Sequence, residues 1–327
     1  MGETRLPADW EPHERCLMAW PGEESRPGAP APEAIHDFAV IAQTIARFEP
    51  VLMLAYPEFV DHAAAACGPN VEVIELEFDD AWIRDSGPLF AVRGAELVAI
   101  DFRFNRYGWS KVPRDRYAET GVLLAAALGI PRLEAPYVLE GGAIASNGEG
   151  TLIAIESSIR TESRNPGATR EELEGAFAEF LGIERTIWLE HGLEEDRTDG
   201  HADNIAMFTG PERVLCQKVE DASDPNAARL AANRATLAQA GLEVFDLPVL
   251  PYSEHDGRRL ARPYLNCFVG NGCVVVPLAG VPADSEGLAV LRGAFPDREV
   301  VGVPGETLAR AGGGVHCITQ QLPLLAR

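Results

Sequence analysis

The chain has 327 residues, of which 46% are apolar, so it can bury a full hydrophobic core and is not a disordered or low-complexity protein. Acidic residues outnumber basic residues by 50 to 28, and the formal net charge is -22. This balance argues against nucleic acid as a partner and for the attraction of cations, although excess carboxylates also serve solubility alone.

The amino-terminal residues predict no targeting segment. They contain no apolar signal core, and Leu6 stands where a myristoylation motif needs Ser or Thr. No run approaches the ~18 apolar residues of a membrane span. The six cysteines are scattered without a Cys-x-x-Cys pair, which indicates neither a zinc ribbon nor a small disulfide framework. We therefore expect a cytoplasmic protein with no membrane partner.

Short apolar runs bounded by turn residues predict strands, and longer stretches between them predict helices. In chain order, the expected strands are 16–20, 51–55, 71–76, 97–101, 151–155, 214–217, 243–247, 273–277 and 300–303. The expected helices are 34–48, 116–128, 170–181, 226–240 and 287–294. Two helix starts carry capping signals: Thr169 with Glu172 is typical of a capping box, and Asp224 precedes Pro225.

These elements predict a mixed α/β fold in which strands come in pairs or threes around each helix. The units repeat at roughly 60 residues, without obvious sequence similarity between them. No long Pro/Gly/Ser linker interrupts the series, and the loosest stretch, 21–32, lies too early to divide two domains. We expect residues 1–327 to form one domain.

Polar residues suited to catalysis gather in four turn-rich segments at the ends of predicted strands: 79–88, 139–142, 198–204 and 312–319. Each segment has an ordinary interpretation when it is taken alone. Asp-Ser-Gly-Pro is a common turn, Glu-Gly-Gly is only a turn, and a lone cysteine is most often buried and inert. Together, however, the four segments supply carboxylates, an imidazole and a thiol.

With segments 6–14 and 319–321, these four resemble the agmatine deiminase family, a branch of the guanidino-modifying enzymes that includes bacterial peptidylarginine deiminases. The segments match in type and order, so the resemblance runs almost from end to end. It implies a single-domain pseudo-fivefold α/β propeller of ββαβ units, with the active site in the central channel. A homodimer is also an expectation for the family.

Carried across residue by residue, the family's catalytic set falls on Asp85, Glu140, His201, Asp203 and Cys317. We also expect substrate contacts from three further residues in or beside the same segments: Trp82, Gly314 and Arg197. The resemblance implies a covalent amidino-thioether on the cysteine and no metal or organic cofactor.

The implied roles have a physical basis. A guanidinium is planar and permanently charged, so two carboxylates, Asp85 and Asp203, could hold it flat from opposite edges. The amidino carbon is a poor electrophile, which favours the thiolate of Cys317 over water as nucleophile. The imidazole of His201 could pass a proton to departing ammonia and take one from water, while Glu140 orients it.

The function that this implies is hydrolysis of agmatine, a small cationic guanidino substrate, to N-carbamoylputrescine and ammonia. Arg197 stands where agmatine-type enzymes tend to be acidic, so peptidyl or free arginine, or another guanidino acid, stays open as the substrate. Amidino transfer to an amine and a catalytically silent guanidinium-binding scaffold are further alternatives. Metal catalysis is disfavoured because His201 and Asp203 lack the H-x-E or C-x-x-C spacing of zinc deaminases.

Two side-chain directions follow from local sequence. Arg197 follows Glu194, Glu195 and Asp196, and we expect it to turn outward and pair within this acidic loop. His316 precedes Cys317, and in an extended segment the two would project to opposite faces. His316 is therefore left out of the catalytic set.

Overall fold

One arrangement of strands recurs along the chain in the computed structural model, which describes residues 3–21, 34–108 and 120–325. An antiparallel pair of strands is followed by a helical connection and a third strand that lies parallel to the second. Five sheets of the described residues contain this arrangement, and a separate two-stranded hairpin completes the set. The mixed α/β class predicted from the sequence is confirmed.

The sheets take their strands largely in chain order. The first contains β19 (Gln320–Pro323), β2 (His13–Ala19), β3 (Val51–Ala55) and β4 (Val71–Glu75), and the second contains β1 (Thr4–Arg5), β5 (Leu89–Arg93), β6 (Glu96–Arg103) and β7 (Arg132–Val138). The third contains β8 (Ile144–Ser146), β9 (Thr151–Ile155) and β10 (Arg185–Leu189), and the fourth contains β11 (Ala206–Gly210), β12 (Arg213–Gln217) and β13 (Glu243–Leu247). The fifth contains β16 (Phe268–Gly270), β17 (Cys273–Leu278) and β18 (Glu299–Pro304), and the hairpin is β14 (Tyr252–His255) with β15 (Arg258–Ala261).

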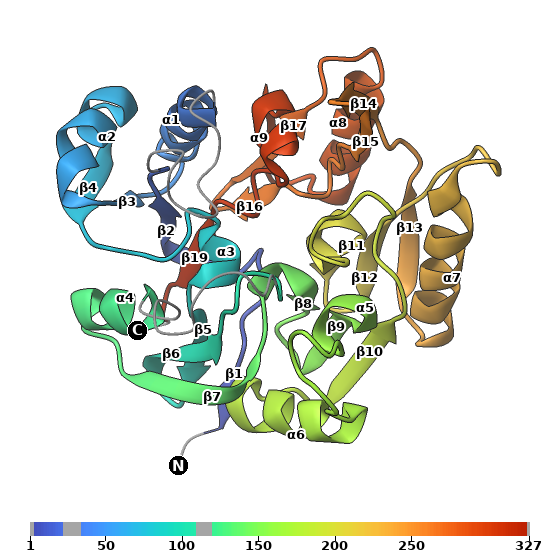
Figure 1. Ribbon diagram of the computed structural model, residues 1–327, viewed down its shortest axis with the longest axis horizontal. Coiled ribbons are helices and arrows are strands. Elements are labelled where there is room, and N and C mark those ends of the chain that lie inside the picture. Colours follow the sequence, from blue (N-terminus) through green and yellow to red (C-terminus); the bar gives the residue numbers. More distant parts are fainter. Residues whose placement is uncertain (1–2, 22–33, 109–119, 326–327) are drawn as a thin grey trace.

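The five sheets follow one another around the middle of the molecule, and most of the longer helices lie on the outside (Figure 1). The longer helices are α1 (Ala34–Ile45), α2 (Val60–Cys67), α4 (Thr120–Leu128), α6 (Arg170–Leu181), α7 (Pro225–Gln239) and α8 (Asp284–Ala294). The short ones are η1 (Pro57–Phe59), α3 (Ile83–Ser86), η3 (Gly141–Ala143), α5 (Glu156–Ile159), η4 (Ala202–Asn204) and α9 (Glu306–Ala311). Strand β19 pairs antiparallel with β2, so the two ends of the chain share one sheet.

The capping signals predicted from the sequence are confirmed. The backbone N–H of Glu172 donates to the Thr169 hydroxyl over 3.2 Å, and the Thr169 N–H donates to the Glu172 carboxylate over 2.9 Å, which makes the capping box of α6. That helix ends at Gly182, whose φ of 69° suits glycine. At the start of α7, the Asp224 carboxylate accepts the N–H of Asn226 over 2.8 Å.

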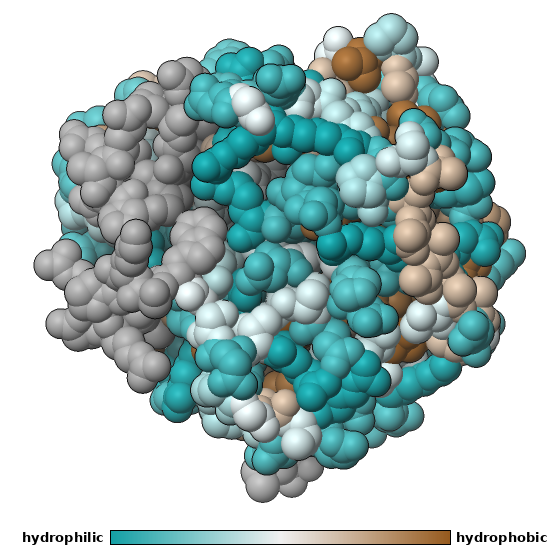
Figure 2. Space-filling view, turned by 45° about the vertical axis from the view of Figure 1, so that its right-hand side comes forward, coloured by the Kyte–Doolittle hydropathy of each residue, from teal (hydrophilic) through white to brown (hydrophobic). Residues whose placement is uncertain are grey.

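Each sheet buries an apolar face against its crossover helix, as the alternation of short runs and helices predicted. In the first sheet, Leu17, Met53 and Leu54 on β2 and β3 meet Phe38 and Ile41 of α1 in one fully buried cluster. The outer surface is mostly hydrophilic in the view of Figure 2, with a narrower band of apolar residues. No helix in the described part of the chain is long and apolar enough to cross a membrane.

Candidate active site

The five predicted catalytic residues come from four separate segments whose side chains meet in the fold. Asp85 lies in α3, Glu140 directly precedes η3, His201 and Asp203 belong to η4 and its N-cap, and Cys317 lies in a turn before β19. Helix α3 contacts η3, which in turn contacts η4. All five side chains are buried.

Gly142 lies between three of these groups. Its N–H donates to Asp85 Oδ1 over 2.9 Å. A Cβ at this position would lie 2.5 Å from His201 Nδ1, 2.9 Å from Asp85 Oδ1 and 3.1 Å from Asp203 Oδ2. Because a Cβ has no room there, only glycine lets the two carboxylates and the imidazole converge this closely.

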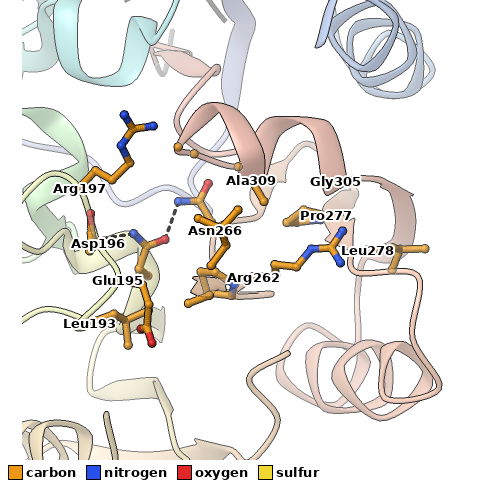
Figure 3. Close-up of a pocket in the computed structure, with 17 residues that line it drawn as sticks. Leu193, Glu195, Asp196, Arg197, Arg262, Asn266, Pro277, Leu278, Gly305 and Ala309 are labelled. Carbon is orange, nitrogen blue, oxygen red and sulfur yellow. Dashed lines mark hydrogen bonds between the residues drawn. The ribbon is translucent and has the colours of Figure 1, made fainter. Parts of the chain in front are cut away.

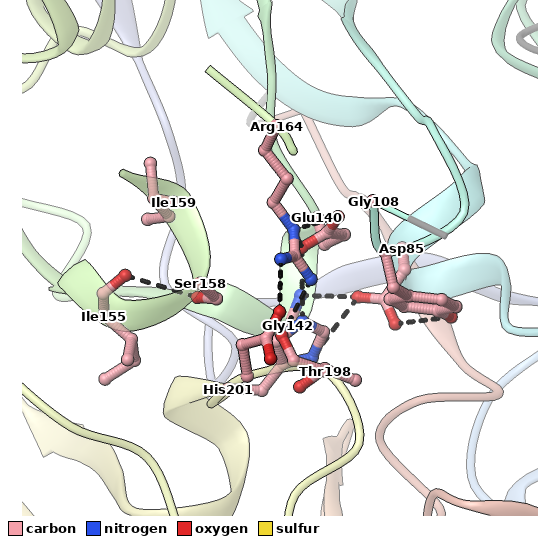
Figure 4. A network of polar contacts seen from close by, with 12 residues as sticks. Asp85, Gly108, Glu140, Gly142, Ile155, Ser158, Ile159, Arg164, Thr198 and His201 are labelled. Atoms are coloured by element: carbon pink, nitrogen blue, oxygen red, sulfur yellow. Dashed lines mark hydrogen bonds and ion pairs between the residues drawn. The ribbon is translucent and has the colours of Figure 1, made fainter. Parts of the chain in front are cut away.

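The imidazole of His201 lies between two carboxylates (Figure 4). Its Nδ1 is 3.8 Å from Asp85 Oδ1, and its Nε2 is 3.5 Å from Glu140 Oε2. Burial opposes the charged imidazolium, but the charge of Asp85 and the contact with Glu140 outweigh it and raise the pKa of His201 to about 10. The ring therefore carries a proton at neutral pH.

Glu140 is in turn held by an arginine that the sequence interpretation missed. Arg164 is buried, and its Nε donates to both Glu140 carboxylate oxygens over 2.8 and 2.9 Å. Its remaining nitrogens bind the Thr198 carbonyl and the Asp199 carboxylate, which anchors the loop before His201. Burial favours the neutral carboxyl, but His201 and the Arg164 charge together lower the pKa of Glu140.

The thiol of Cys317 faces Asp203 and an asparagine that sequence reasoning also missed. Its Sγ is 3.6 Å from Asp203 Oδ2 and 3.1 Å from Asn266 Nδ2. Asn266 Oδ1 accepts the backbone N–H groups of His316 and Cys317, over 3.0 and 3.3 Å, and so fixes the turn that presents the thiol. Burial and the charges of Asp203 and Asp85 raise the pKa of the Cys317 thiol well above its usual range.

Tyr107 is the third residue missed. Its hydroxyl donates to Asp85 Oδ2 over 3.2 Å, and its ring lies 6.2 Å from the His201 ring. Arg106 and Tyr107 have φ values of 55° and 61°, a region that non-glycine residues seldom occupy. Burial, with the nearby Asp203 and Glu140 charges, outweighs the His201 charge and raises the pKa of Asp85 to about 6.

A cavity opens in front of the thiol. Its lining residues come from four segments: Trp82, Asp85, Tyr107, Arg197, Ala311, Gly312 and Cys317. Two of the three further substrate contacts expected from the sequence, Trp82 and Arg197, thus line the cavity that contains the nucleophile. The third, Gly314, lines a neighbouring cavity, where a Cβ on it would lie 2.5 Å from Asn266 Oδ1.

The expected orientation of Arg197 was wrong. Arg197 is an exposed residue. Its side chain nevertheless lies over Gly312 and lines the Cys317 cavity rather than turning back onto its own loop. The reason is that the acidic neighbours are engaged elsewhere. Glu194 pairs with Arg229 and Glu195 with Arg259, while Asp196 accepts hydrogen bonds from its own loop, including the His201 N–H over 3.0 Å.

His316 also lies differently from its expected position. Residues 315–318 form a turn rather than an extended segment, so the ring is not directed away from the site. Its Nδ1 lies 2.9 Å from Asp203 Oδ2, and its Nε2 lies 3.2 Å from Asp9 Oδ2. The imidazole thus helps to hold Asp203. In residues 3–21, 34–108 and 120–325, no group of three or more His, Cys, Asp and Glu side chains is arranged to hold a metal ion.

Comparison with known proteins gives a consistent picture. Residues 5–323 match the profile of the Porphyromonas-type peptidyl-arginine deiminase family. The chain is 38% identical to an agmatine deiminase of Stutzerimonas stutzeri, over 97% of this chain and 95% of that protein, and 36% identical to one of Pseudomonas aeruginosa, over 98% and 95%.

Solved structures are similar over the same extent. The agmatine deiminase of Enterococcus faecalis superposes with a TM-score of 0.93 at 27% identity, covering 99% of this chain and 97% of that one. A cysteine-to-serine variant of the C. jejuni agmatine deiminase with substrate bound superposes with a TM-score of 0.90 at 25% identity, covering 99% and 97%.

Proposed function

The chain belongs to the Porphyromonas-type peptidyl-arginine deiminase family, and on that premise we propose that it hydrolyses agmatine to N-carbamoylputrescine and ammonia. It is a hydrolase of the C–N bonds of a guanidinium group, with a cysteine as its nucleophile. The observation that carries this function is the buried cluster in which the Cys317 thiol meets Asp203, 3.6 Å away, beside the His201–Asp85 pair. The C. jejuni relative, whose substrate complex was obtained with a cysteine-to-serine variant, supports the same chemistry.

Binding of the cation prepares the nucleophile. Asp85 and Asp203 hold the guanidinium through its N–H groups, with the Trp82 and Tyr107 rings beside it in the cavity. In the free protein the Cys317 thiol keeps its proton, because burial and the charges of Asp203 and Asp85 raise its pKa. A bound guanidinium brings the opposite charge close to Sγ, so the thiol pKa falls and its proton leaves to solvent.

The first half of the reaction forms the covalent intermediate. The Cys317 thiolate adds to the amidino carbon, making a C–S bond and a neutral tetrahedral centre. The protonated His201 then gives its proton to the departing nitrogen, the C–N bond breaks, and ammonia leaves. The amidino group remains on sulfur as a cationic thioether, still next to Asp85 and Asp203.

The second half returns the enzyme to its starting state. Neutral His201 takes a proton from a water that adds to the same carbon and is thereby protonated again. The C–S bond then breaks, and the hydroxyl proton of the tetrahedral centre passes to the leaving thiolate as the neutral ureido product forms. Glu140, fixed by Arg164, supports the imidazolium in both halves.

We further propose that the five sheets form a pseudo-fivefold propeller of a single domain, residues 1–327, with the site in its central channel. The recurring strand arrangement and the position of α3 near the middle of the view in Figure 1 support this architecture. The chain would act in the cytoplasm, without a metal or organic cofactor, and as a homodimer. The lack of a cofactor and the homodimer follow from the family resemblance and can be tested by chelation and by sedimentation. The cytoplasmic location can be tested by fractionation.

Ammonia release from agmatine tests the function. The wild type should produce one ammonia and one ureido product per turnover, and Cys317→Ser should be slower by several orders of magnitude in kcat, because a serine hydroxyl is far less ionised than a thiol. Cys67→Ser, on α2 and outside the cavity, is the matched control and should keep the wild-type rate. An amidino-transfer enzyme would need an added amine, and a silent scaffold would release no ammonia.

One observation favours a second substrate class. Arg197 lines the cavity beside Cys317, and two like charges ~6 Å apart repel by about 3 kcal/mol at an effective dielectric near 20. That repulsion would weaken the binding of agmatine, whose ammonium carries the same charge as Arg197. It would favour arginine or another guanidino acid as the substrate. The test compares kcat/KM for agmatine and arginine in the wild type and in Arg197→Glu. Agmatine should be preferred by the wild type; a preference of more than tenfold for arginine, reversed in the variant, would assign Arg197 to a carboxylate instead.

A further inference from the structure

A second cavity adjoins the one in front of the nucleophile and shares Arg197 and Gly312 with it. Its walls are the glycine run 312–314, Asn266 and the segment 260–263 that follows from β15 (Figure 3). None of the five catalytic side chains lines it, although Gly314 and Arg197, both expected as substrate contacts, do. Its most unusual lining residue is Arg262.

Arg262 is only 8% exposed, yet its guanidinium is incompletely hydrogen-bonded. Nη1 donates to the Ala279 carbonyl over 2.7 Å, while Nε and Nη2 have no hydrogen-bond partner among the described residues. Nε and Nη2 lie on one edge of the guanidinium, and their N–H bonds point the same way. This edge is the fork that takes the two oxygens of a carboxylate.

We propose that this cavity is a binding site for a small carboxylate, whose two oxygens accept hydrogen bonds from Nε and Nη2 of Arg262. A buried guanidinium that lacks partners is costly, and a bidentate carboxylate satisfies both its charge and its donors. Asn204 also lines the cavity, and the second N–H of its amide, beside the one that donates to Asp196 Oδ2, can serve a second polar group of the ligand. This inference does not depend on which guanidino substrate the enzyme hydrolyses.

The acidic residues nearby do not fill this role. Glu306 Oε2 lies 3.8 Å from Nη2, beyond hydrogen-bonding distance, and its side chain is half exposed and also pairs with Arg310. Glu195 and Asp196 lie across Asn266 from the Arg262 guanidinium in Figure 3, and each has partners of its own. The buried Arg262 edge therefore has no hydrogen-bonded partner among the described residues, and Glu306 is the competitor of an outside anion.

The proposed carboxylate site lies next to the residues that position the Cys317 thiol. Asn266 forms one wall of the cavity, and its amide contacts Cys317 Sγ over 3.1 Å and holds the turn around it. A carboxylate bound here rests against the residues that position the thiol. Occupancy should therefore change the rate at which iodoacetamide alkylates Cys317.

Succinate is the probe for the test. It is titrated into the ¹⁵N-labelled protein while the arginine Nε–H resonances are followed by NMR, and its affinity is measured by calorimetry. One resonance, absent from Arg262→Gln, should shift with saturation, and the affinity of that variant should fall at least tenfold. Cys317→Ser should bind as the wild type does, as should Arg229→Gln, which removes an arginine outside this cavity.

The variant Glu306→Gln gives a second binding measurement in which the buried Arg262 is unchanged. It removes the competing carboxylate, so succinate should bind more tightly to it than to the wild type. The proposal is overturned if the wild type shows no saturable shift, if Arg262→Gln binds with wild-type affinity, or if Glu306→Gln binds no more tightly. Thermal unfolding checks that Arg262→Gln is folded; if it is not, the Glu306→Gln arm decides.

Discussion

At the scale of single residues, the site depends on how burial and neighbouring charges set proton positions. Burial, with the charges of Asp203 and Glu140, raises the pKa of Asp85 to about 6 against the opposing His201 charge. Burial opposes the imidazolium of His201, but the Asp85 charge and the contact with Glu140 raise its pKa to about 10. The cation-binding carboxylate thus ionises just below neutrality, while the proton donor stays charged. Burial and the charges of Asp203 and Asp85 raise the pKa of the Cys317 thiol and keep it protonated until the substrate arrives.

This arrangement predicts the acid limb of the pH profile. Asp85 must be ionised to attract a guanidinium, so kcat/KM for agmatine should fall as the pH drops through about 6. The Tyr107 hydroxyl donates to Asp85 and favours its charged form. Tyr107→Phe should therefore raise the pKa of Asp85 and move the acid limb to higher pH, by roughly one unit or less.

The measurement is kcat/KM from pH 4 to 8, roughly, in the wild type and in two variants. Tyr137→Phe, on β7, is the matched control and should keep the wild-type profile. An unchanged limb in Tyr107→Phe would show that the hydroxyl does not act on Asp85. A fall in kcat/KM by one factor at every pH would point to a packing role for the ring instead.

At the scale of elements, patterned segments were predictable and short ones were not. All nine expected strands are strands, and β3, β9 and β13 have the expected bounds. The hairpin partners β5, β8, β11 and β16 were missed because they are only three to five residues long. The first three come shortly after the turn-rich segments 79–88, 139–142 and 198–204. Helix α2, Val60–Cys67, was also missed; it is only eight residues long.

The capping box of α6 gives a prediction at this scale. Thr169→Ala removes the hydroxyl that accepts the Glu172 N–H, so the free energy of unfolding should fall by about 1 kcal/mol. Helix α6 lies on the outside of the fold, and kcat/KM should not change (Figure 1). Thr236→Ala, inside α7, is the matched control and should lose less than Thr169→Ala, as urea unfolding will show. An equal loss of unfolding free energy in Thr169→Ala and Thr236→Ala would mean that the capping hydrogen bond contributes nothing to stability.

At the scale of the whole molecule, the sequence could identify the site's segments but not its supporting residues. The catalytic set was assigned from the family resemblance, which rests on turn-rich segments that match in residue type and order. Arg164, Asn266 and Tyr107 lie outside the segments that carry this resemblance, and only the tertiary contacts with Glu140, Cys317 and Asp85 reveal what they do. Arg197 was misjudged because its acidic neighbours have partners distant in sequence.

The net charge predicts how the molecule meets its substrate. A formal charge of -22 attracts doubly charged agmatine, and dissolved salt screens that attraction. kcat/KM for agmatine should fall as NaCl rises from about 50 to 500 mM, mainly through KM. Alkylation of Cys317 by neutral iodoacetamide is the control and should change little. A kcat/KM that is independent of salt would show that the charge serves solubility alone.

The most direct test of the central claim is the mass of the enzyme during turnover. Wild-type protein is mixed with agmatine, quenched in acid within one turnover, and analysed intact and after digestion. We predict an increase equal to the mass of agmatine less ammonia, located on Cys317 and absent from Cys317→Ser. An unmodified Cys317 throughout turnover, together with undiminished ammonia release by Cys317→Ser, would contradict the covalent mechanism.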